Sequence, residues 1–356
     1  MVQSGTQDRS SRETALTMYI LGIETSCDET SAAILSEDFK VYANVIHSQT
    51  NHARFGGVVP EIASREHCVR IEEVVRTALT RASLSSSDIG LVCATSNPGL
   101  IGALLVGLSF ARGFAWSHHI PFVSVNHLDG HIKANIFTDP KAVQPPYIAL
   151  LVSGGHTFLV RCGEEGRYSL VGNTLDDAAG EALDKAGKLM GLPYPAGRRV
   201  EELASTGNPF FAAFPRALPG KDNLNFSFSG LKTALKNFLK TVEPAAMESR
   251  QTDILASFQE AVMDVLARKS LQAMRIFGDR KLLLAGGVAC NGLLRKKLTL
   301  SLHGNQELYF PTPEYCTDNG AMIAAAGLLK YRRLGADTGV VQASAVFNIT
   351  EVNYES

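Results

Sequence analysis

Two segments of the chain repeat one pattern of apolar and polar positions. Residues 20–23 are apolar, residues 24–31 are polar and small, and residues 32–35 are apolar again, which predicts two strands around an acidic turn. The same order returns between residues 147 and 160, where an apolar run, a polar glycine-containing turn and a second apolar run follow one another. This repetition predicts two duplicated lobes.

A second pattern, a buried strand followed by a glycine-containing turn and a helix, also occurs twice. Residues 91–94 run into Thr95-Ser96-Asn97-Pro98-Gly99 and then an apolar helix, while residues 281–285 run into Gly286-Gly287 and a helix that starts near Asn291. Such a unit aims backbone N–H groups at an anion. The alternative for each is a plain tight turn in an α/β sheet, and the pattern leaves both open.

The length of the chain predicts two lobes. At 356 residues it exceeds the size at which one hydrophobic core stops growing, so lobes of roughly 150 residues are expected. We assign residues 18–146 to the first lobe and residues 147–334 to the second. Residues 175–274 are mainly helical in pattern and broken by prolines, which predicts a helical insertion on the second lobe.

The two ends of the chain differ from these lobes in composition. Residues 1–17 are polar and carry both acids and bases, so we expect a disordered extension rather than a targeting segment. Residues 317–334 predict an Ala-rich final helix that can pack back on the first lobe. The polar tail at residues 335–356 is expected to pack loosely.

Composition and charge exclude several classes of protein. Hydrophobic residues make up 45% and charged residues 19%, as in ordinary globular proteins. The net charge of -1 gives no overall attraction to a polyanion, so nucleic-acid contacts require local basic patches. The six cysteines are scattered without a Cys-x-x-Cys pair, which favours reduced thiols in the cytoplasm. The apolar run from Leu100 is interrupted by Arg112 and is too short to span a membrane.

A pair of histidines four residues apart is the strongest candidate for chemistry. In a helix, His127 and His131 lie on one face about one turn apart, where both can bind one metal ion. The alternative is a solvated helix face, and Gly130 between them weakens the helix. Leu128 stands where the zinc-protease pattern requires a Glu general base, which disfavours a protease.

Several motifs taken together resemble the bacterial and organellar branch of the threonylcarbamoyl transferase family that modifies tRNA (TsaD, historically O-sialoglycoprotein endopeptidase). They are Ile23-Glu24-Thr25-Ser26-Cys27-Asp28-Glu29-Thr30, Gly56-Gly57-Val58-Val59-Pro60-Glu61, Ser227-Phe228-Ser229-Gly230-Leu231-Lys232, Gly286-Gly287-Val288, and the segments around His131 and His156. The resemblance runs from Met18 to about Tyr331. It implies an α/β fold, the two-lobed actin-like ATPase and sugar kinase (ASKHA) fold, with a helical insertion in the second lobe.

The resemblance also implies a metal site. Its ligands would be His127, His131 and Asp318, which leave coordination positions open for substrate. One divalent metal per subunit is expected, with Fe(2+) favoured and Zn(2+) as the alternative. Taken alone, Asp318 would more often be the N-cap of the Ala-rich helix.

By the same resemblance, the nucleotide and substrate positions fall on residues of the second lobe. They are Leu151, Val152, Ser153, Gly154, Gly155, Asp184, Gly197 and Asn291. Glycines let backbone amides approach a phosphate, and Asp184 can accept hydrogen bonds from ribose hydroxyls. Asn291 can bind an adenine or ribose edge, or it can be a turn or helix-cap residue.

The chain departs from the family pattern near these positions. It has Pro195-Ala196-Gly197-Arg198 where the family usually has Pro-Gly-Gly-Pro, so the turn near the sugar has one glycine fewer and one cation more. Asn97 replaces a common glycine. Both changes affect loop shape, whereas the metal ligands are retained.

Charged residues of three further segments complete the candidate site. Asp28 and Glu29 occupy the turn where related folds place an acid near the phosphates, and we expect them to act electrostatically or to hold water. Basic candidates for tRNA contact are Lys232, Lys236 and Lys240, spaced for one helical face, and Arg295, Lys296 and Lys297. For both basic groups, ordinary solvated surface is the alternative.

The implied reaction transfers threonylcarbamoyl from threonylcarbamoyl-AMP to N6 of adenosine 37 in tRNAs that read codons beginning with A, releasing AMP. The implied partners are the tRNA anticodon loop, an inactive paralogue (TsaB-like) and a P-loop ATPase (TsaE-like), with no membrane. Two alternatives are a small-metabolite kinase of the same fold and a nucleotide-gated scaffold without catalysis. Neither alternative gives His127, His131 and Asp318 a function.

Overall fold

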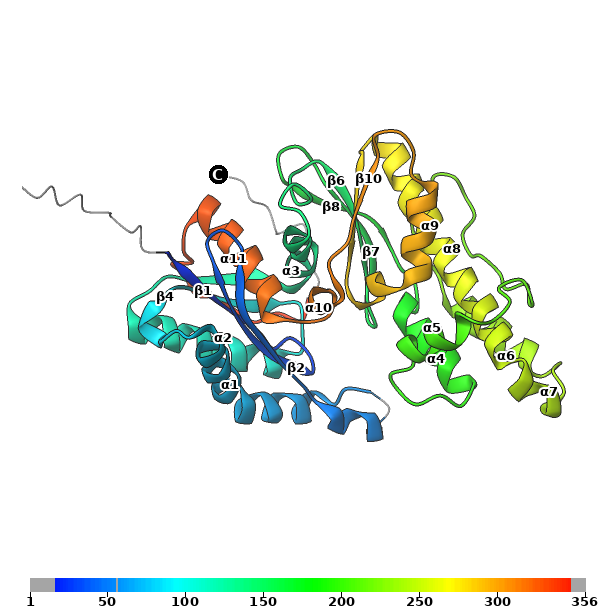
Figure 1. The fold of residues 1–356 in the computed structure, drawn as a ribbon, viewed down its shortest axis with the longest axis horizontal. Coiled ribbons are helices and arrows are strands. Elements are labelled where there is room, and N and C mark those ends of the chain that lie inside the picture. Colours follow the sequence, from blue (N-terminus) through cyan, green and yellow to red (C-terminus); the bar gives the residue numbers. More distant parts are fainter. Residues whose placement is uncertain (1–16, 56, 347–356) are drawn as a thin grey trace, which may run out of the picture.

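The computed structural model describes residues 17–55 and 57–346, so the predicted extension falls outside the described residues except for its last position. Each lobe is built on a five-stranded sheet (Figure 1). The strands of the first sheet are β1 (Tyr19–Glu24), β2 (Glu29–Ser36), β3 (Val41–Ser48), β4 (Ile89–Asn97) and β5 (Phe122–Asn126). Those of the second are β6 (Tyr147–Val152), β7 (Thr157–Cys162), β8 (Tyr168–Asn173), β9 (Lys281–Ala285) and β10 (Glu307–Tyr309).

The two sheets have the same topology, which confirms the duplication predicted from the repeated pattern. The strand orders are β3-β2-β1-β4-β5 and β10-β9-β6-β7-β8. In each, the first two strands form an antiparallel hairpin, with β1 paired to β2 and β6 to β7. A later strand then pairs in parallel with the first, β4 with β1 and β9 with β6. The acidic turn and the glycine turn therefore occupy equivalent positions in the two lobes.

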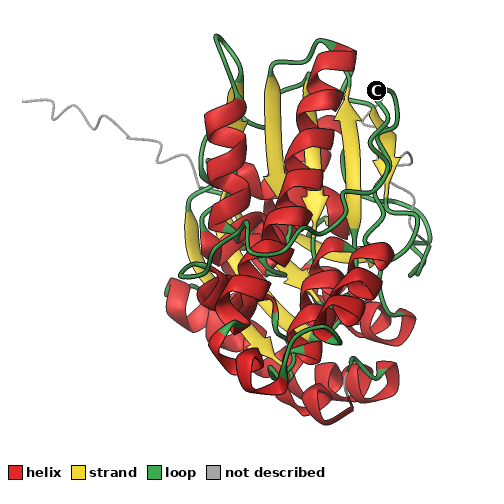
Figure 2. Cartoon of the chain, turned by 90° about the vertical axis from the view of Figure 1, so that its right-hand side faces the viewer, coloured by secondary structure: helices red, strands yellow, loops and turns green. Residues whose placement is uncertain are grey.

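Helices cover the faces of these sheets. The α-helices are α1 (Pro60–Ala82), α2 (Ile101–His118), α3 (His127–Lys133), α4 (Ala179–Leu189), α5 (Gly197–Ala204), α6 (Ser229–Leu239), α7 (Pro244–Ser249), α8 (Gln251–Phe277), α9 (Gly292–Ser301), α10 (Pro313–Cys316) and α11 (Gly320–Leu334). The short 3-10 helices are η1 (Thr50–Phe55), η2 (Ser86–Asp88), η3 (Ala134–Phe137) and η4 (Gly287–Cys290). Figure 2 shows the helices of the second lobe in front of the strands.

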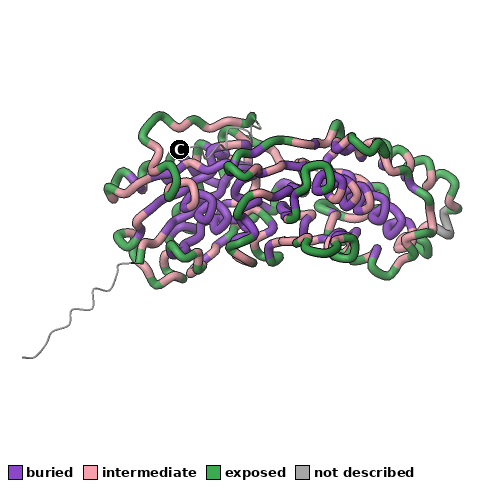
Figure 3. The backbone as a smooth tube through the Cα atoms, turned by 90° about the horizontal axis from the view of Figure 1, so that it is seen from above, coloured by how far each residue is buried: buried purple, intermediate pink, exposed green. Residues whose placement is uncertain are grey.

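Three apolar clusters form the core. One packs α1 and α2 on the outer face of the first sheet, and one packs the second sheet against α4, α8 and α9. The third joins the lobes, because residues of α3 and α11 pack there with residues of both sheets. Buried residues accordingly occur in both halves of the molecule (Figure 3). Apolar burial on this scale stabilises the join between the lobes.

The final helix, α11, packs against the first sheet although it follows the second lobe in sequence. Its first residue, Gly320, lies so close to the sheet that an added Cβ would stand 2.5 Å from the backbone nitrogen of Ala33 and 2.7 Å from the carbonyl oxygen of Gly22. Side chains larger than hydrogen would push the helix away. This contact fixes the position of the residues just before α11.

The prediction that the tail packs loosely is wrong for its described part, up to residue 346. The Asp337 carboxylate accepts hydrogen bonds from the backbone nitrogen and the hydroxyl of Ser124, at 2.7 and 2.5 Å. Lys330 pairs with the same carboxylate at 3.1 Å. These contacts, together with backbone hydrogen bonds to Phe122 and Ser96, hold a polar segment against the first sheet, which polarity alone does not reveal.

None of the helices within residues 17–55 and 57–346 combines the length and apolar character needed to cross a membrane.

Candidate functional site

The helix that carries the two histidines begins at the first of them. The side chain of Asn126 accepts hydrogen bonds from the backbone nitrogens of Leu128 and Asp129, at 2.9 and 3.3 Å, and so caps α3. His127 and His131 consequently share one face, with ring centroids 4.7 Å apart. Only 6% of His127 and 3% of His131 is exposed, so the solvated-face alternative is excluded.

Gly130, expected to weaken this helix, instead allows it to approach α11. An added Cβ at this position would lie 2.8 Å from Cδ1 of Ile323 and 3.3 Å from Cγ of Met322. The helix is only seven residues long, and its stability comes from capping and packing rather than from intrinsic propensity.

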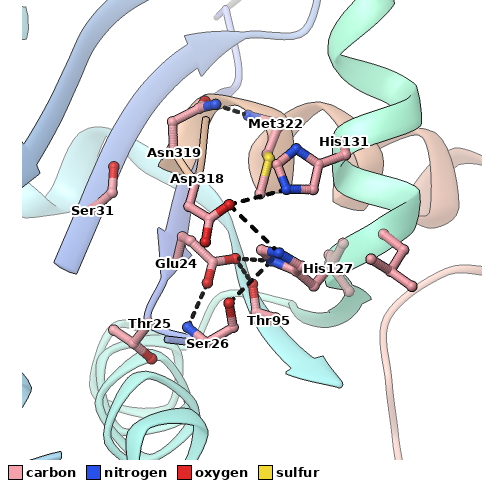
Figure 4. A network of polar contacts seen from close by, with 12 residues as sticks. Glu24, Thr25, Ser26, Ser31, Thr95, His127, His131, Asp318, Asn319 and Met322 are labelled. Carbon is pink, nitrogen blue, oxygen red and sulfur yellow. Dashed lines mark hydrogen bonds and ion pairs between the residues drawn. The ribbon is translucent and has the colours of Figure 1, made fainter. Parts of the chain in front are cut away.

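Asp318 reaches the histidines from the turn before α11 (Figure 4). Its Oδ1 lies 3.0 Å from Nε2 of His131 and 3.6 Å from Nε2 of His127. The capping task expected of Asp318 falls to Asn319, whose side chain accepts a hydrogen bond from the backbone nitrogen of Met322 at 3.0 Å. The carboxylate of Asp318 is therefore available to the imidazoles.

Glu24, a residue to which the sequence analysis gave no role, completes the cluster. Its buried carboxylate lies 3.0 Å from Nδ1 of His127 and accepts hydrogen bonds of 2.5 Å from the backbone nitrogen of Ser26 and the hydroxyl of Thr95. Burial alone would raise the pKa of Glu24, but His127 and Ser26 outweigh it and lower the pKa. The sequence signal that could have identified Glu24 was its position as an acid at the end of a predicted strand, within one of the family motifs.

The charges of the cluster shift the pKa values of its members. Burial disfavours the charged imidazole of His127, yet the carboxylates of Asp318 and Glu24 outweigh this cost and raise its pKa to about 9. Burial opposes ionisation of Asp318, but the imidazoles of His127 and His131 hold its pKa well below the usual range. The cluster is thus arranged to hold positive charge between the rings and Asp318.

These three side chains fit one divalent metal ion. A ligand atom from each of His127, His131 and Asp318 lies within 4.8 Å of the others. Because Nδ1 of His127 contacts Glu24, its Nε2 remains as the ligand atom, and it is Nε2 that faces Asp318. Two imidazoles and a carboxylate are donors that Zn(2+) and Fe(2+) accept, and a carboxylate behind a ligating histidine is a common second contact.

The glycine turn of the second lobe lies beside this cluster. Residues 153–156 connect β6 to β7, and nothing stands within 4 Å of an added Cβ on Gly154 or Gly155. Burial together with the charges of His127 and His131 lowers the pKa of His156, at the end of the turn, to about 4. Because the space beside Gly154 and Gly155 is open, a phosphate can approach the backbone of this turn. Leu151 and Val152 are fully buried, so only their backbone atoms could contribute.

The side chains of two other predicted nucleotide contacts, Asp184 and Asn291, already form hydrogen bonds within the protein. Oδ1 of Asp184 accepts hydrogen bonds from the backbone nitrogens of Ala196 and Gly197, at 2.7 and 2.9 Å, so it shapes the turn that replaces the usual Pro-Gly-Gly-Pro. Burial raises the pKa of Asp184, and these two hydrogen bonds partly offset the rise.

Asn291 is the N-cap of α9, the second of the two alternatives left open by the sequence. Its Oδ1 accepts hydrogen bonds from the backbone nitrogens of Leu293 and Leu294, at 3.1 and 3.2 Å. Its Nδ2 donates to Oε1 of Gln259 at 3.0 Å. With the side chain buried and both ends bonded, the structure favours a capping role.

The acidic turn between β1 and β2 brings Asp28 and Glu29 to the same side as Asp318. Burial, followed by the charges of Asp318 and Asp28, raises the pKa of Glu29 to about 9. Glu29 is therefore protonated at neutral pH when no cation is present, and its carboxyl group can donate a hydrogen bond.

The basic candidates for tRNA contact differ in availability. Lys236 and Lys240 are exposed at the C-terminal half of α6, with Lys232 half-buried one turn earlier, and Lys296 is exposed on α9. The guanidinium of Arg295 instead donates to the carbonyl oxygens of Ala289 and Pro311, at 2.7 and 3.1 Å, and lies 4.2 Å from the ring centre of Phe310. Lys297 contacts Glu260 and Asp264 at 2.5 Å. Arg295 and Lys297 thus have internal roles.

Comparisons with known proteins agree with this site. The family model described as "TsaD: tRNA N6-adenosine threonylcarbamoyltransferase" matches residues 40–325. A Streptococcus pneumoniae protein named tRNA N6-adenosine threonylcarbamoyltransferase is 48% identical over 316 residues, which cover 88% of this chain and 93% of the relative. A Geotalea daltonii protein of the same name is 49% identical over 313 residues, covering 87% and 91%. These names support a transferase and neither of the two alternatives.

Solved structures show the fold. The crystal structure of T. kodakarensis HypF superposes with a TM-score of 0.58 at 15% identity, covering 88% of this chain and 48% of that one. Component A of (R)-2-hydroxyglutaryl-CoA dehydratase from Acidaminococcus fermentans gives a TM-score of 0.53 at 16% identity, covering 88% and 99%. The two lobes have the actin-like ATPase and sugar kinase fold that the sequence predicts.

Proposed function

Because the chain belongs to the tRNA N6-adenosine threonylcarbamoyltransferase family, we propose that it transfers a threonylcarbamoyl group to the N6 amine of an adenosine in tRNA. The proposed donor is threonylcarbamoyl-AMP, and the acceptor is adenosine 37 of tRNAs that read codons beginning with A. The observation that carries the proposal is the convergence of two buried histidines, His127 and His131, with the partly exposed Asp318 beside the open glycine turn.

The reaction forms one bond and breaks another. The N6 nitrogen attacks the carbamoyl carbon of the mixed anhydride, the bond from that carbon to the phosphate oxygen breaks, AMP leaves with the electron pair, and the amine gives up one proton. The donor is already activated, so the protein mainly has to position it and stabilise charge on the carbonyl oxygen. No nucleophilic side chain is required.

The two ends of the donor would be held by different parts of the site. His127, His131 and Asp318 would hold a divalent metal ion, Fe(2+) rather than Zn(2+) by the family resemblance, with Glu24 orienting His127. Such a metal supplies Lewis-acid polarisation of the threonylcarbamoyl end. The backbone of Gly154 and Gly155 would bind the phosphate, since the backbone nitrogen of Ser153 already donates to His156, and the turn around Gly197 would face the sugar.

Recognition of tRNA is assigned to exposed basic residues. The anticodon loop is single-stranded, so its bases can be reached with little unpairing. The exposed Lys236 and Lys296 and the half-buried Lys232 remain as candidates, because none of them forms an ion pair within the described residues. Because phosphate contacts release counterions, affinity for tRNA should fall steeply as salt is raised.

The family resemblance also supplies the proposed context. An inactive paralogue (TsaB-like) and a P-loop ATPase (TsaE-like) would be partners, and a separate enzyme would make the adenylate. The scattered free cysteines are in keeping with a place in the cytoplasm.

The proposal is tested by mixing purified protein and its partners with synthetic threonylcarbamoyl-AMP and tRNA. We expect AMP release that depends on tRNA, and mass-spectrometric nucleoside analysis that finds threonylcarbamoyladenosine. A tRNA with guanosine in place of adenosine 37 is the matched control and should give neither product. Equal AMP release with the control tRNA, or phosphorylation of a small metabolite from ATP instead, would overturn the proposal.

A further inference from the structure

A second face of α3, opposite the histidines, carries two buried charges. Asp129 and Lys133 follow His127 and His131 by two residues each, which is about 200° around a helix. The histidines therefore face Asp318 and α11, while Asp129 and Lys133 face the second sheet. Both are buried, and a buried charge is costly unless it is hydrogen-bonded.

Two buried tyrosines of the second sheet connect these charges. The hydroxyl of Tyr168, on β8, donates to Oδ1 of Asp129 at 2.7 Å, and Nζ of Lys133 donates to the hydroxyl of Tyr147, on β6, at 3.1 Å. The two hydroxyls lie 2.8 Å apart. Nζ of Lys133 also lies 5.7 and 5.5 Å from the two ring centres, within the range of cation–π attraction.

In this chain of hydrogen bonds, each hydroxyl accepts from one neighbour and donates to the next. The single hydroxyl hydrogen of Tyr168 goes to the carboxylate, so Tyr147 must donate to Tyr168 while it accepts from Lys133. Burial raises the pKa of Tyr147 well above its usual value, which keeps this hydroxyl protonated and able to donate. Removing one hydroxyl would take one hydrogen bond away from a buried charged group.

This chain of hydrogen bonds connects α3 to the second sheet. Its α3 end lies about half a turn from the histidines, and its β6 end, Tyr147, is the first residue of β6, at the opposite end of that strand from the glycine turn. Rotation of α3 about its axis would break the bonds to Tyr168 and Tyr147 and also turn both imidazoles away from Asp318. The second sheet therefore opposes one movement that would separate the three candidate ligands.

We propose that Asp129, Lys133, Tyr147 and Tyr168 are positioning residues that fix the rotation of α3, so that His127 and His131 meet Asp318. This inference rests on the proposed function, because it assigns the four residues to the metal end of that site. None of the four contacts substrate in this role. They act through the two histidines.

The test is Co²⁺ binding to metal-free protein, followed by the visible absorption of the bound ion, for wild type and Tyr168→Phe. Phenylalanine keeps the ring and removes one hydroxyl. We expect Co²⁺ affinity to fall about 10-fold or more, as for other supporting contacts of metal ligands, and the spectrum of the saturated variant to change. Tyr309→Phe is the matched control, because that hydroxyl donates a hydrogen bond to the exposed Glu307, and this variant should match wild type.

A merely structural role predicts a different result. It would lower the melting temperature of the metal-free protein and leave the spectrum of the Co²⁺-saturated protein unchanged, and this outcome overturns the inference. Tyr147→Phe provides the same test if Tyr168→Phe does not fold. Wild-type protein that fails to bind Co²⁺ would overturn the metal assignment and this inference together, whereas tRNA-dependent AMP release would still decide the proposed transfer.

Discussion

The two ends of the candidate site are built differently. At the metal end, Glu24, His127, His131 and Asp318 come from three separated segments and contact one another in a buried cluster. At the nucleotide end, the glycine turn is exposed backbone, and the side chains of Asp184 and Asn291 are bonded to their own loops. The metal end thus depends on side-chain identity, whereas the nucleotide end depends on backbone shape.

The largest effect is expected from His131→Ala. This change removes one of the three candidate ligands and should abolish both Co²⁺ binding and threonylcarbamoyl transfer, which is a loss of at least about 100-fold. Isothermal titration with Co²⁺ and nucleoside analysis measure the two effects. His303→Ala, at an exposed position, is the control and should behave as wild type. Full transfer by His131→Ala would contradict the side-chain dependence of this end.

A smaller effect is expected from Glu24→Gln. The amide keeps the size of the carboxylate but loses the charge that stabilises His127, so Co²⁺ affinity should fall by roughly 10–100-fold. The pKa of His127 should also fall, because its partner becomes neutral, and this can be followed by NMR titration of the imidazole in metal-free protein. Glu61→Gln, on the exposed first turn of α1, should leave both values unchanged. An unaltered Co²⁺ affinity in Glu24→Gln would remove Glu24 from the site.

Gly320→Ala tests whether close packing of α11 positions Asp318. The added Cβ meets backbone atoms of β1 and β2, which cannot move aside cheaply, so we expect a loss of about 3 kcal/mol of unfolding free energy and weaker metal binding. Gly113→Ala in α2 meets nothing within 4 Å and should be neutral or slightly stabilising. Denaturant unfolding compares the two. Equal stability of both variants would show that α11 can shift without cost.

Asn291→Ala tests whether the Asn291 side chain caps α9 or contacts the nucleotide. Loss of the cap and of the bond to Gln259 should cost about 1–2 kcal/mol of unfolding free energy. AMP affinity should change less than about 3-fold, because under a capping role the side chain does not contact the nucleotide. Asn237→Ala, exposed on α6, is the control for stability. A 10-fold loss of AMP affinity would instead identify Asn291 as a direct contact.

The smallest effect is a pH dependence at Asp184. Burial raises the pKa of this carboxyl in the folded state, so its stabilising contribution is fully present below the unfolded pKa of about 3.9 and is lost as the pH rises through the folded value. Asp184→Asn can still accept both backbone hydrogen bonds but does not titrate. The unfolding free energy of wild type minus that of the variant should therefore fall between acidic and neutral pH. A stability difference that rises with pH over this range would contradict the raised pKa of Asp184.

Local patterns predicted much of the fold. The apolar runs around the acidic and glycine turns predicted β1, β2, β6 and β7, because strands that are buried along most of their length leave a run of apolar residues in the sequence. The spacing of His127 and His131 was compatible with a helix, and its cap, Asn126, is adjacent in sequence. Such features depend on neighbouring residues only.

Several roles could not be read from local patterns. Asp318 and Asn319 are both good caps, and only the path into α11 decides that Asn319 caps while Asp318 faces the histidines. Arg295 looked like a surface cation, and its carbonyl partners lie in segments that the sequence does not place beside it. Each case is a choice between two locally acceptable uses of one side chain.

The sequence by itself determined the elements, the duplicated topology and the residue types able to bind a metal and a phosphate, because these follow from periodicity and side-chain chemistry. Tertiary structure alone decided that Glu24, His127 and Asp318 share one buried cluster, that α11 returns to the first sheet, and that Tyr147 and Tyr168 bond to α3. The physical reason is that these contacts join segments more than a hundred residues apart or from different lobes, where packing rather than local order selects the partner.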